Sequence, residues 1–113
     1  MEWGETSLSS LGEIRSNIDK IDKEIVVLLC RRGELVKQAA RFKPNPANVK
    51  DLKRLEQIIE KVTSYAKEMN FDSFTIENIY RNMIEQFIQL EMKTYSDLRS
   101  NSHKYSKTVG GFF

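Results

Sequence analysis

Four ionisable side chains interrupt an apolar helical pattern, and their types suit recognition of a small anion. Arg32, Lys43 and Glu91 each follow apolar residues by four and seven positions, and Arg15 lies beside the start of the same pattern. A charge on an apolar helix face is costly unless it is paired or binds a ligand. Arginine also offers a planar fork that matches a carboxylate. These positions predict a site for a dianionic ligand, although long basic side chains can also reach water from the edge of such a face.

The spacing of the two arginines adds a constraint on that site. Arg15 and Arg32 are seventeen residues apart, which is ~25 Å along one helix. A small ligand cannot touch both from one chain. If both arginines serve one site, they must come from two chains.

The elements that position these residues are helical, and the first helix is expected to be very long. Ser10 and Glu13 form a capping box, and the helical pattern runs to Phe42, where Pro44 and Pro46 end it. Such a helix is roughly 45–50 Å long, whereas a domain of this size is about 27 Å across. A second chain must therefore cover it, which predicts an intertwined homodimer. The apolar stripe contains Leu11, Ile14, Ile18, Ile21, Ile25, Leu28, Val36 and Ala39.

Two more helices complete the predicted all-α, three-helix subunit, which as a dimer makes a six-helix bundle. Asn48 is expected to cap the second helix, and Asn70 to end it in a left-handed conformation. Asp72 or Ser73 is expected to begin the third. We therefore expect an N-terminal arm at 1–9, one helical domain at 10–98 and a flexible tail at 99–113.

Composition excludes several classes of protein. The 113 residues carry 18 basic and 16 acidic side chains, a net charge of +2, without the basic block typical of nucleic-acid binding. No apolar run is long enough to cross a bilayer, and the N-terminus does not resemble a secretory signal. The single cysteine cannot form an internal disulfide and fits a reducing compartment. A soluble cytoplasmic protein without nucleic-acid or membrane partners is expected.

Three segments resemble the all-helical (AroQ, type II) chorismate mutases. They are LGEIRSNIDKIDKEIVVLLCRRGELVKQAARFK, VKDLKRLEQIIEKV and NIYRNMIEQFIQLE, and the similarity extends from Leu11 to Tyr95. The shared pattern is an arginine before an Ile-Asp repeat, a double arginine seventeen residues later, and a lysine eleven residues beyond. The resemblance implies an intertwined dimer with two shared sites that convert chorismate to prephenate.

The resemblance also assigns roles to individual residues. Arg32 would hold one carboxylate of chorismate, and Arg15 of the other chain would hold the second. Lys43 would donate to the ether oxygen and a carboxylate. Arg54 matches a supporting arginine of the second helix, and Asp51 matches an acidic residue that touches the substrate hydroxyl.

Three further positions bear on which substrate is used. Glu91 falls where the family has Gln or Glu beside the ether oxygen. Leu55 replaces a common glutamate, and Phe87 replaces a common serine. Leu55, the spacing from Lys43 to Arg54 and the phrases CRRGELVKQAARFK and KTY resemble the isochorismate pyruvate lyases, which release salicylate and pyruvate.

The choice of substrate and activity stays open on the sequence alone. Asp51 and Glu91 favour chorismate mutase over the lyase. A mutase for 4-amino-4-deoxychorismate is a further alternative. Leu55 and Phe87 also allow a non-catalytic helical module that kept the fold.

The rearrangement is unimolecular, so we expect no nucleophile, metal or cofactor. The protein must hold the substrate in a chair-like shape and stabilise charge on the ether oxygen. Arg32 and Arg15, which fix the two carboxylates, supply the first need. Lys43 and Glu91 supply the second, but Glu91 can donate only when protonated. Burial raises the pKa of a carboxyl and nearby cations lower it. Activity is therefore expected to fall as the pH rises through neutrality.

Overall fold

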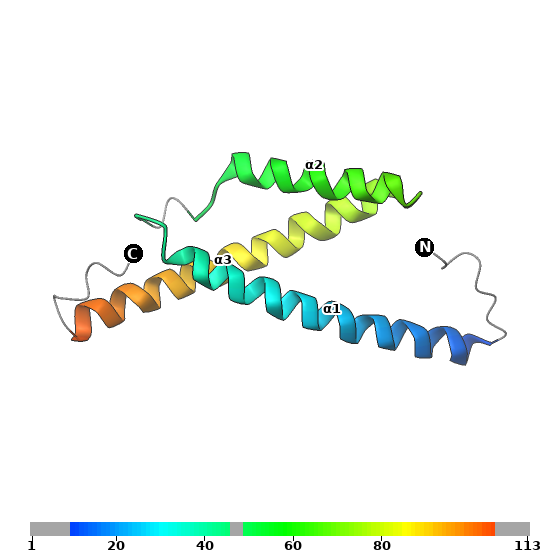
Figure 1. The fold of residues 1–113 in the computed structure, drawn as a ribbon, viewed down its shortest axis with the longest axis horizontal. Coiled ribbons are helices and arrows are strands. Elements are labelled where there is room, and N and C mark those ends of the chain that lie inside the picture. The colour runs from blue at the N-terminus through cyan, green and yellow to red at the C-terminus, as the bar shows by residue number, and fades with distance from the viewer. Residues whose placement is uncertain (1–9, 46–48, 106–113) are drawn as a thin grey trace. The chain divides into compact units, whose positions relative to one another are not determined.

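The structure, a computed structural model, describes residues 10–45 and 49–105, with side chains as far as Leu98. Its three helices are α1 (Leu11–Ala40), α2 (Leu52–Glu68) and α3 (Ser73–Tyr105) (Figure 1). No strand occurs within the described residues, so the predicted all-α, three-helix chain is confirmed. None of these helices is both long and apolar enough to cross a membrane.

The first helix contributes to two compact units, whose boundary lies between Arg32 and Gly33. In the first unit, α1 begins as the sequence predicts, because the amide of Glu13 donates to the Ser10 hydroxyl oxygen over 3.1 Å. That contact satisfies one of the backbone donors that a helix start leaves without an intrahelical partner. The apolar stripe of this unit is exposed in the single chain. Its exposed members are Leu11, Ile14, Ile18, Ile25 and Leu28.

In the second unit, α1 ends at Ala40, two residues before the predicted end. The amides of Arg41, Phe42 and Lys43 donate to carbonyls only three residues back, over 3.2, 3.0 and 3.3 Å. The last turn is therefore tighter than an α-helix. Pro44 has no amide hydrogen and disfavours helix in the residue before it. Lys43 accordingly lies in a turn after α1, and not on the helical stripe where the sequence pattern placed it.

The start of α2 differs from the prediction by three residues. Asp51 is the N-cap, and its Oδ1 accepts the amide of Arg54 over 3.0 Å. Asn48, the expected cap, lies outside the described residues. The carboxylate of Asp51 suits the cap position for two reasons. It accepts a backbone amide, and its negative charge lies at the positive end of α2.

The turn between α2 and α3 follows the expected chemistry. Asn70 has φ 55°, the left-handed conformation that asparagine tolerates. The amide of Phe71 donates to the carbonyl of Ala66 over 2.9 Å, which completes a Schellman motif. Asp72 then caps α3, since its carboxylate accepts the Phe74 amide over 3.2 Å and the Thr75 hydroxyl over 2.6 Å. The hydrogen bond from Thr75 is the main cause of the lowered pKa of Asp72.

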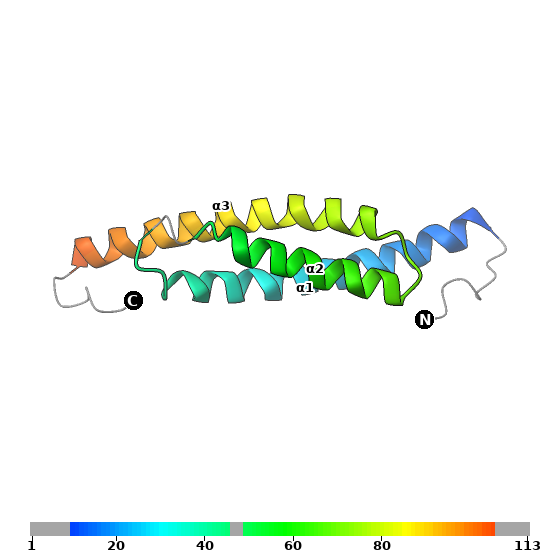
Figure 2. The same cartoon turned by 90° about the horizontal axis from the view of Figure 1, so that it is seen from above.

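Helices α2 and α3 run antiparallel and lie side by side (Figure 2). The buried apolar residues of this pair of helices are Ile59 and Ala66 on α2 and Ile84 on α3, each no more than 7% exposed. A charged network crosses the same pair of helices. Arg81 on α3 donates to both carboxylate oxygens of Glu56 on α2, over 3.1 and 3.2 Å, and to Glu77 over 2.9 Å.

The third helix is longer than the sequence indicated. It continues to Tyr105, so residues 99–105, which the sequence pattern assigned to the tail, are helical. The physical reason is the absence of a helix breaker, because no glycine or proline lies between Leu98 and Tyr105. The expected arm at 1–9 and the end of the expected tail, 106–113, lie outside the described residues.

Candidate active site

The structure brings together two of the predicted catalytic side chains, Lys43 and Glu91. Glu91 lies on α3 and is 7% exposed, so the prediction that it occupies the buried face is confirmed. Lys43 Nζ lies 3.0 Å from Glu91 Oε2, and the lysine side chain is 26% exposed. A carboxylate so deeply buried needs a compensating cation, and Lys43 provides it.

The contact between Lys43 and Glu91 is an ion pair without good hydrogen-bond alignment. The buried Oε2 atom has Nζ at 3.0 Å, yet it accepts no hydrogen bond of acceptable direction. Alignment contributes much of the strength of a charged hydrogen bond. The attraction between these two side chains is therefore mainly that of opposite charges, and an anionic ligand of the right shape can compete for the lysine.

The turn that carries Lys43 is also bonded to α3 through its backbone. The hydroxyl of Tyr95 donates to the carbonyl oxygen of Pro44 over 3.0 Å. Tyr95 is 3% exposed and follows Glu91 by four residues, so both lie on one face of α3. The sequence pattern marked Tyr95 only as the end of an apolar stripe. The sequence did contain a signal for this contact. Tyr95 lies one helical turn after Glu91 on the buried face, and a buried tyrosine hydroxyl needs a hydrogen-bond partner.

Phe87 lies where α1 and α3 approach each other in the second unit. A Cβ atom added to Gly33 would lie 3.3 Å from Phe87 Cε1 and 3.6 Å from Leu90 Cδ2. Gly33 is buried, and its missing side chain lets the aromatic ring rest on the α1 backbone. Phe87 is half-buried and thus fills this crossing with apolar volume, one turn of α3 before Glu91.

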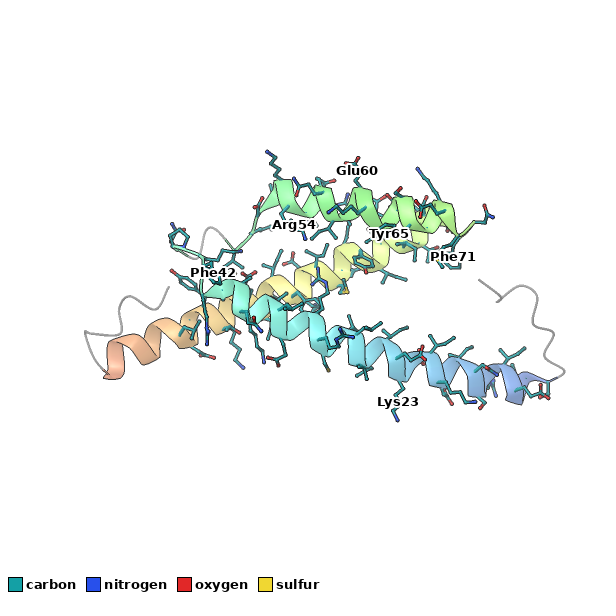
Figure 3. All side chains as sticks on the ribbon, in the orientation of Figure 1. Lys23, Phe42, Arg54, Glu60, Tyr65 and Phe71 are labelled. Carbon is teal, nitrogen blue, oxygen red and sulfur yellow. The ribbon has the colours of Figure 1, made fainter. Side chains whose placement is uncertain are left out.

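Three predicted site residues, Asp51, Arg54 and Leu55, lie at the start of α2, and Arg54 is labelled in Figure 3. Asp51 and Arg54 are exposed, and Leu55 is half-buried. The Asp51 carboxylate already caps the helix through the Arg54 amide, so it has a structural task in addition to the role implied by the resemblance. The structure does not record a contact between the Arg54 side chain and the pair of Lys43 and Glu91.

The two remaining arginines belong to the first unit. Arg15 is exposed near the start of α1, and Arg32 is half-buried at the end of that unit. Both lie on one helix, so the separation of ~25 Å estimated from helical geometry applies. One chain does not bring Arg15 and Arg32 together.

The described residues do not assemble a group of three or more His, Cys, Asp or Glu side chains suited to a metal ion. Besides the pair of Lys43 and Glu91, charged groups meet across α2 and α3 in the network of Arg81 with Glu56 and Glu77. The hydrogen bond from Arg81 lowers the pKa of Glu56, and the two carboxylates raise the pKa of Arg81.

The three helices and the charged positions define a chain of the type II chorismate mutase class. The family model for chorismate mutase type II matches residues 14–92. This chain belongs to that family, which confirms the resemblance seen in the sequence.

Several curated proteins are similar to it. An isochorismate pyruvate lyase of Pseudomonas aeruginosa is 31% identical over 80% of this chain and 90% of its own length. A chorismate mutase of Methanocaldococcus jannaschii is 32% identical over 86% of this chain and 98% of its own length. The bifunctional chorismate mutase/prephenate dehydratase of Buchnera aphidicola (subspecies Schizaphis graminum) is 33% identical over 77% of this chain but only 23% of its own length.

Proposed function

We propose that this protein is a chorismate mutase, which rearranges chorismate to prephenate. The observation that carries the proposal is the contact of Lys43 with Glu91 over 3.0 Å on a buried face, in a chain of the type II family. A cation and a carboxyl at one point can both face an oxygen that gains charge as its bond to carbon breaks. The proposal is tested by offering chorismate and isochorismate separately and measuring prephenate, salicylate and pyruvate.

The reaction breaks one carbon–oxygen bond and forms one carbon–carbon bond within a single molecule, so no group is lost. The protein has to hold the reactive shape and stabilise the developing charge. We assign the second task to Lys43 Nζ and to the protonated carboxyl of Glu91. In the ligand-free structure Lys43 Nζ lies 3.0 Å from Glu91 Oε2, so the ligand has to take over Lys43.

The first task falls to residues that bind the two carboxylates. Arg32 binds one of them, and Arg15 of a second copy binds the other, because the helix keeps the two arginines of one chain too far apart. Arg54 supports the site, and Asp51 meets the ring hydroxyl. Leu55 and Phe87 supply apolar walls.

An intertwined homodimer, the predicted six-helix bundle around the long α1, belongs to this proposal. Five apolar side chains of the α1 stripe, Leu11, Ile14, Ile18, Ile25 and Leu28, are 41–59% exposed in one chain. Contiguous exposed apolar surface of this kind marks a protein interface. A second copy is the occupant that also completes the site by contributing Arg15. We place the enzyme in the cytoplasm, since its only cysteine is unpaired.

Isochorismate pyruvate lyase is the second candidate activity. The similarity to the Pseudomonas aeruginosa lyase, together with an apolar residue at Leu55, supports it. Asp51 and Glu91 favour the mutase. Salicylate and pyruvate formed in equal amounts from isochorismate, with little prephenate from chorismate, would decide for the lyase.

Arg32 separates both enzymes from a non-catalytic helical module. Arg32→Ala should reduce kcat/KM by about 10²- to 10³-fold, because one carboxylate loses its charged partner. The matched control is Arg31→Ala, which removes an exposed arginine from the next position. Sedimentation should show that both variants retain the oligomeric state of the unmodified chain. Absence of turnover of either substrate by the unmodified protein would exclude both enzymes.

A further inference from the structure

Tyr95 makes a contact that the proposed reaction does not use. Its side chain is almost fully buried, with 3% exposed, and its hydroxyl donates to the carbonyl oxygen of Pro44 over 3.0 Å. Pro44 directly follows Lys43. One face of α3 therefore makes two contacts with the turn after α1. Glu91 contacts the side chain of Lys43, and Tyr95 contacts the backbone at Pro44.

The turn is weakly fixed by its own hydrogen bonds. The amides of Arg41, Phe42 and Lys43 bond three residues back, and the Lys43 amide does so over 3.3 Å. Such bonds have poorer geometry than those of an α-helix. Pro44 has no amide to continue the series, so the contact with Tyr95 anchors the backbone where the helix has ended.

The two anchors respond differently to an anionic ligand. A carboxylate that binds Lys43 Nζ competes with Glu91, which weakens the ion pair. The hydrogen bond between Tyr95 and Pro44 joins two neutral groups, so it does not compete for the ligand's charge. It can keep the lysine backbone in place while the side chain changes its partner.

We propose that Tyr95 is a positioning residue that fixes the backbone at Lys43 so that its Nζ meets the substrate. This inference rests on the proposed function of the site. Tyr95 acts through Lys43 and does not touch the ligand. A buried tyrosine hydroxyl would also find a partner for structural reasons alone, and the two roles make different predictions.

The kinetic test uses Tyr95→Phe, which removes only the hydroxyl and retains the ring in the core. The matched control is Tyr80→Phe, the same change at a half-buried position earlier on α3. On whichever substrate the unmodified chain converts, Tyr95→Phe should raise KM and lower kcat, for a combined loss of roughly ten- to a hundredfold. A purely structural role would change the thermal midpoint or the active fraction and leave KM unchanged.

A second measurement needs no substrate. Hydrogen exchange in the ligand-free protein should accelerate roughly two- to tenfold at the amides of Arg41, Phe42 and Lys43 in Tyr95→Phe, as expected for one lost hydrogen bond. Exchange along α2 should stay as in the unmodified chain. Tyr80→Phe should leave the three amides unchanged.

The outcomes separate this inference from the proposed function. Unchanged exchange at the three amides, or equal acceleration throughout α2 and α3, would overturn the positioning role. Unaltered KM and kcat beside an active unmodified chain would overturn it as well, and would leave the proposed function intact. An unmodified chain that converts neither substrate would instead overturn the proposed function.

Discussion

Two ion pairs join α3 to other elements, and they differ in alignment and burial. Arg81 donates to both oxygens of Glu56 over 3.1 and 3.2 Å, and the carboxylate side chain is 62% exposed. Glu91 meets Lys43 over 3.0 Å with its side chain only 9% exposed, yet the contact is poorly aligned. The exposed pair has the better hydrogen-bond geometry. The buried pair has lost more of its contact with water, which costs free energy.

This difference separates a structural pair from a functional one. An exposed pair adds little stability, because water and salt screen it. Its two hydrogen bonds nevertheless join α2 to α3. A buried pair with poor alignment gains less from its own contact, so an anionic ligand can more readily replace Glu91 as the partner of Lys43. Substitutions at the buried pair should therefore change mainly the activity, and substitutions at the exposed pair mainly the thermal midpoint.

The largest effect is expected at Lys43. Lys43→Ala removes the cation proposed to stabilise the ether oxygen, and kcat/KM should fall about 10²- to 10³-fold. The control is Lys37→Ala, which removes a lysine of the same unit that pairs with Glu34 at the surface. Steady-state kinetics measure the change, and circular dichroism checks that both variants are helical. Equal losses in both variants would contradict the role of Lys43.

The next effect concerns pH. If the acid form of Glu91 donates to the ether oxygen, activity falls as the pH rises, because the proton to be donated is lost. Glu91→Gln keeps a donor at every pH and should flatten the profile of kcat between pH 5 and 8. Gln89→Glu changes an exposed position of α3 and should leave the slope as it is. A rate for the unmodified chain that climbs steadily over this range would count against Glu91 as a donor.

The smallest effect is expected at the exposed pair. Glu56→Gln should lower the thermal midpoint slightly and leave kcat/KM unchanged. The hydrogen bond from Arg81 lowers the pKa of Glu56, so its stabilisation is complete above about pH 4.3, the unfolded value, and is lost as the pH falls through the lower folded value. Midpoints of the two proteins should converge once the pH falls below the folded value. A difference that stays constant through this fall in pH would show that the charge is not the cause.

Local rules predicted much of the fold. The hydroxyl of Ser10 caps α1, Asn70 adopts a left-handed conformation, and α3 begins after Asp72. Each depends on a few neighbouring residues, so the sequence contains the whole cause. The predicted end of α3 was wrong. The polar residues after Leu98 were interpreted as the end of the helix, although no glycine or proline lies between Leu98 and Tyr105.

The site was predicted less completely, because contacts between distant residues have no local signature. Apolar spacing indicated that Glu91 is buried, and the structure agrees. Spacing could not show that Lys43 lies beyond the end of α1, nor that Tyr95 reaches the carbonyl of Pro44, a partner 51 residues away in the chain. The roles of Arg15 and Arg32 involve a second chain and remain predictions.

In the proposed homodimer, the exposed stripe of α1 makes the stability of the fold depend on protein concentration. Side chains such as Leu11 and Leu28, which are 59% and 56% exposed in one chain, gain about 25 cal/mol for each Å² of apolar surface that association buries. A chain that buries this surface only by pairing is more stable at higher concentration. Dilution lowers the free energy of unfolding of such a protein. The amount of protein present in the cell is then one of the variables that set its stability.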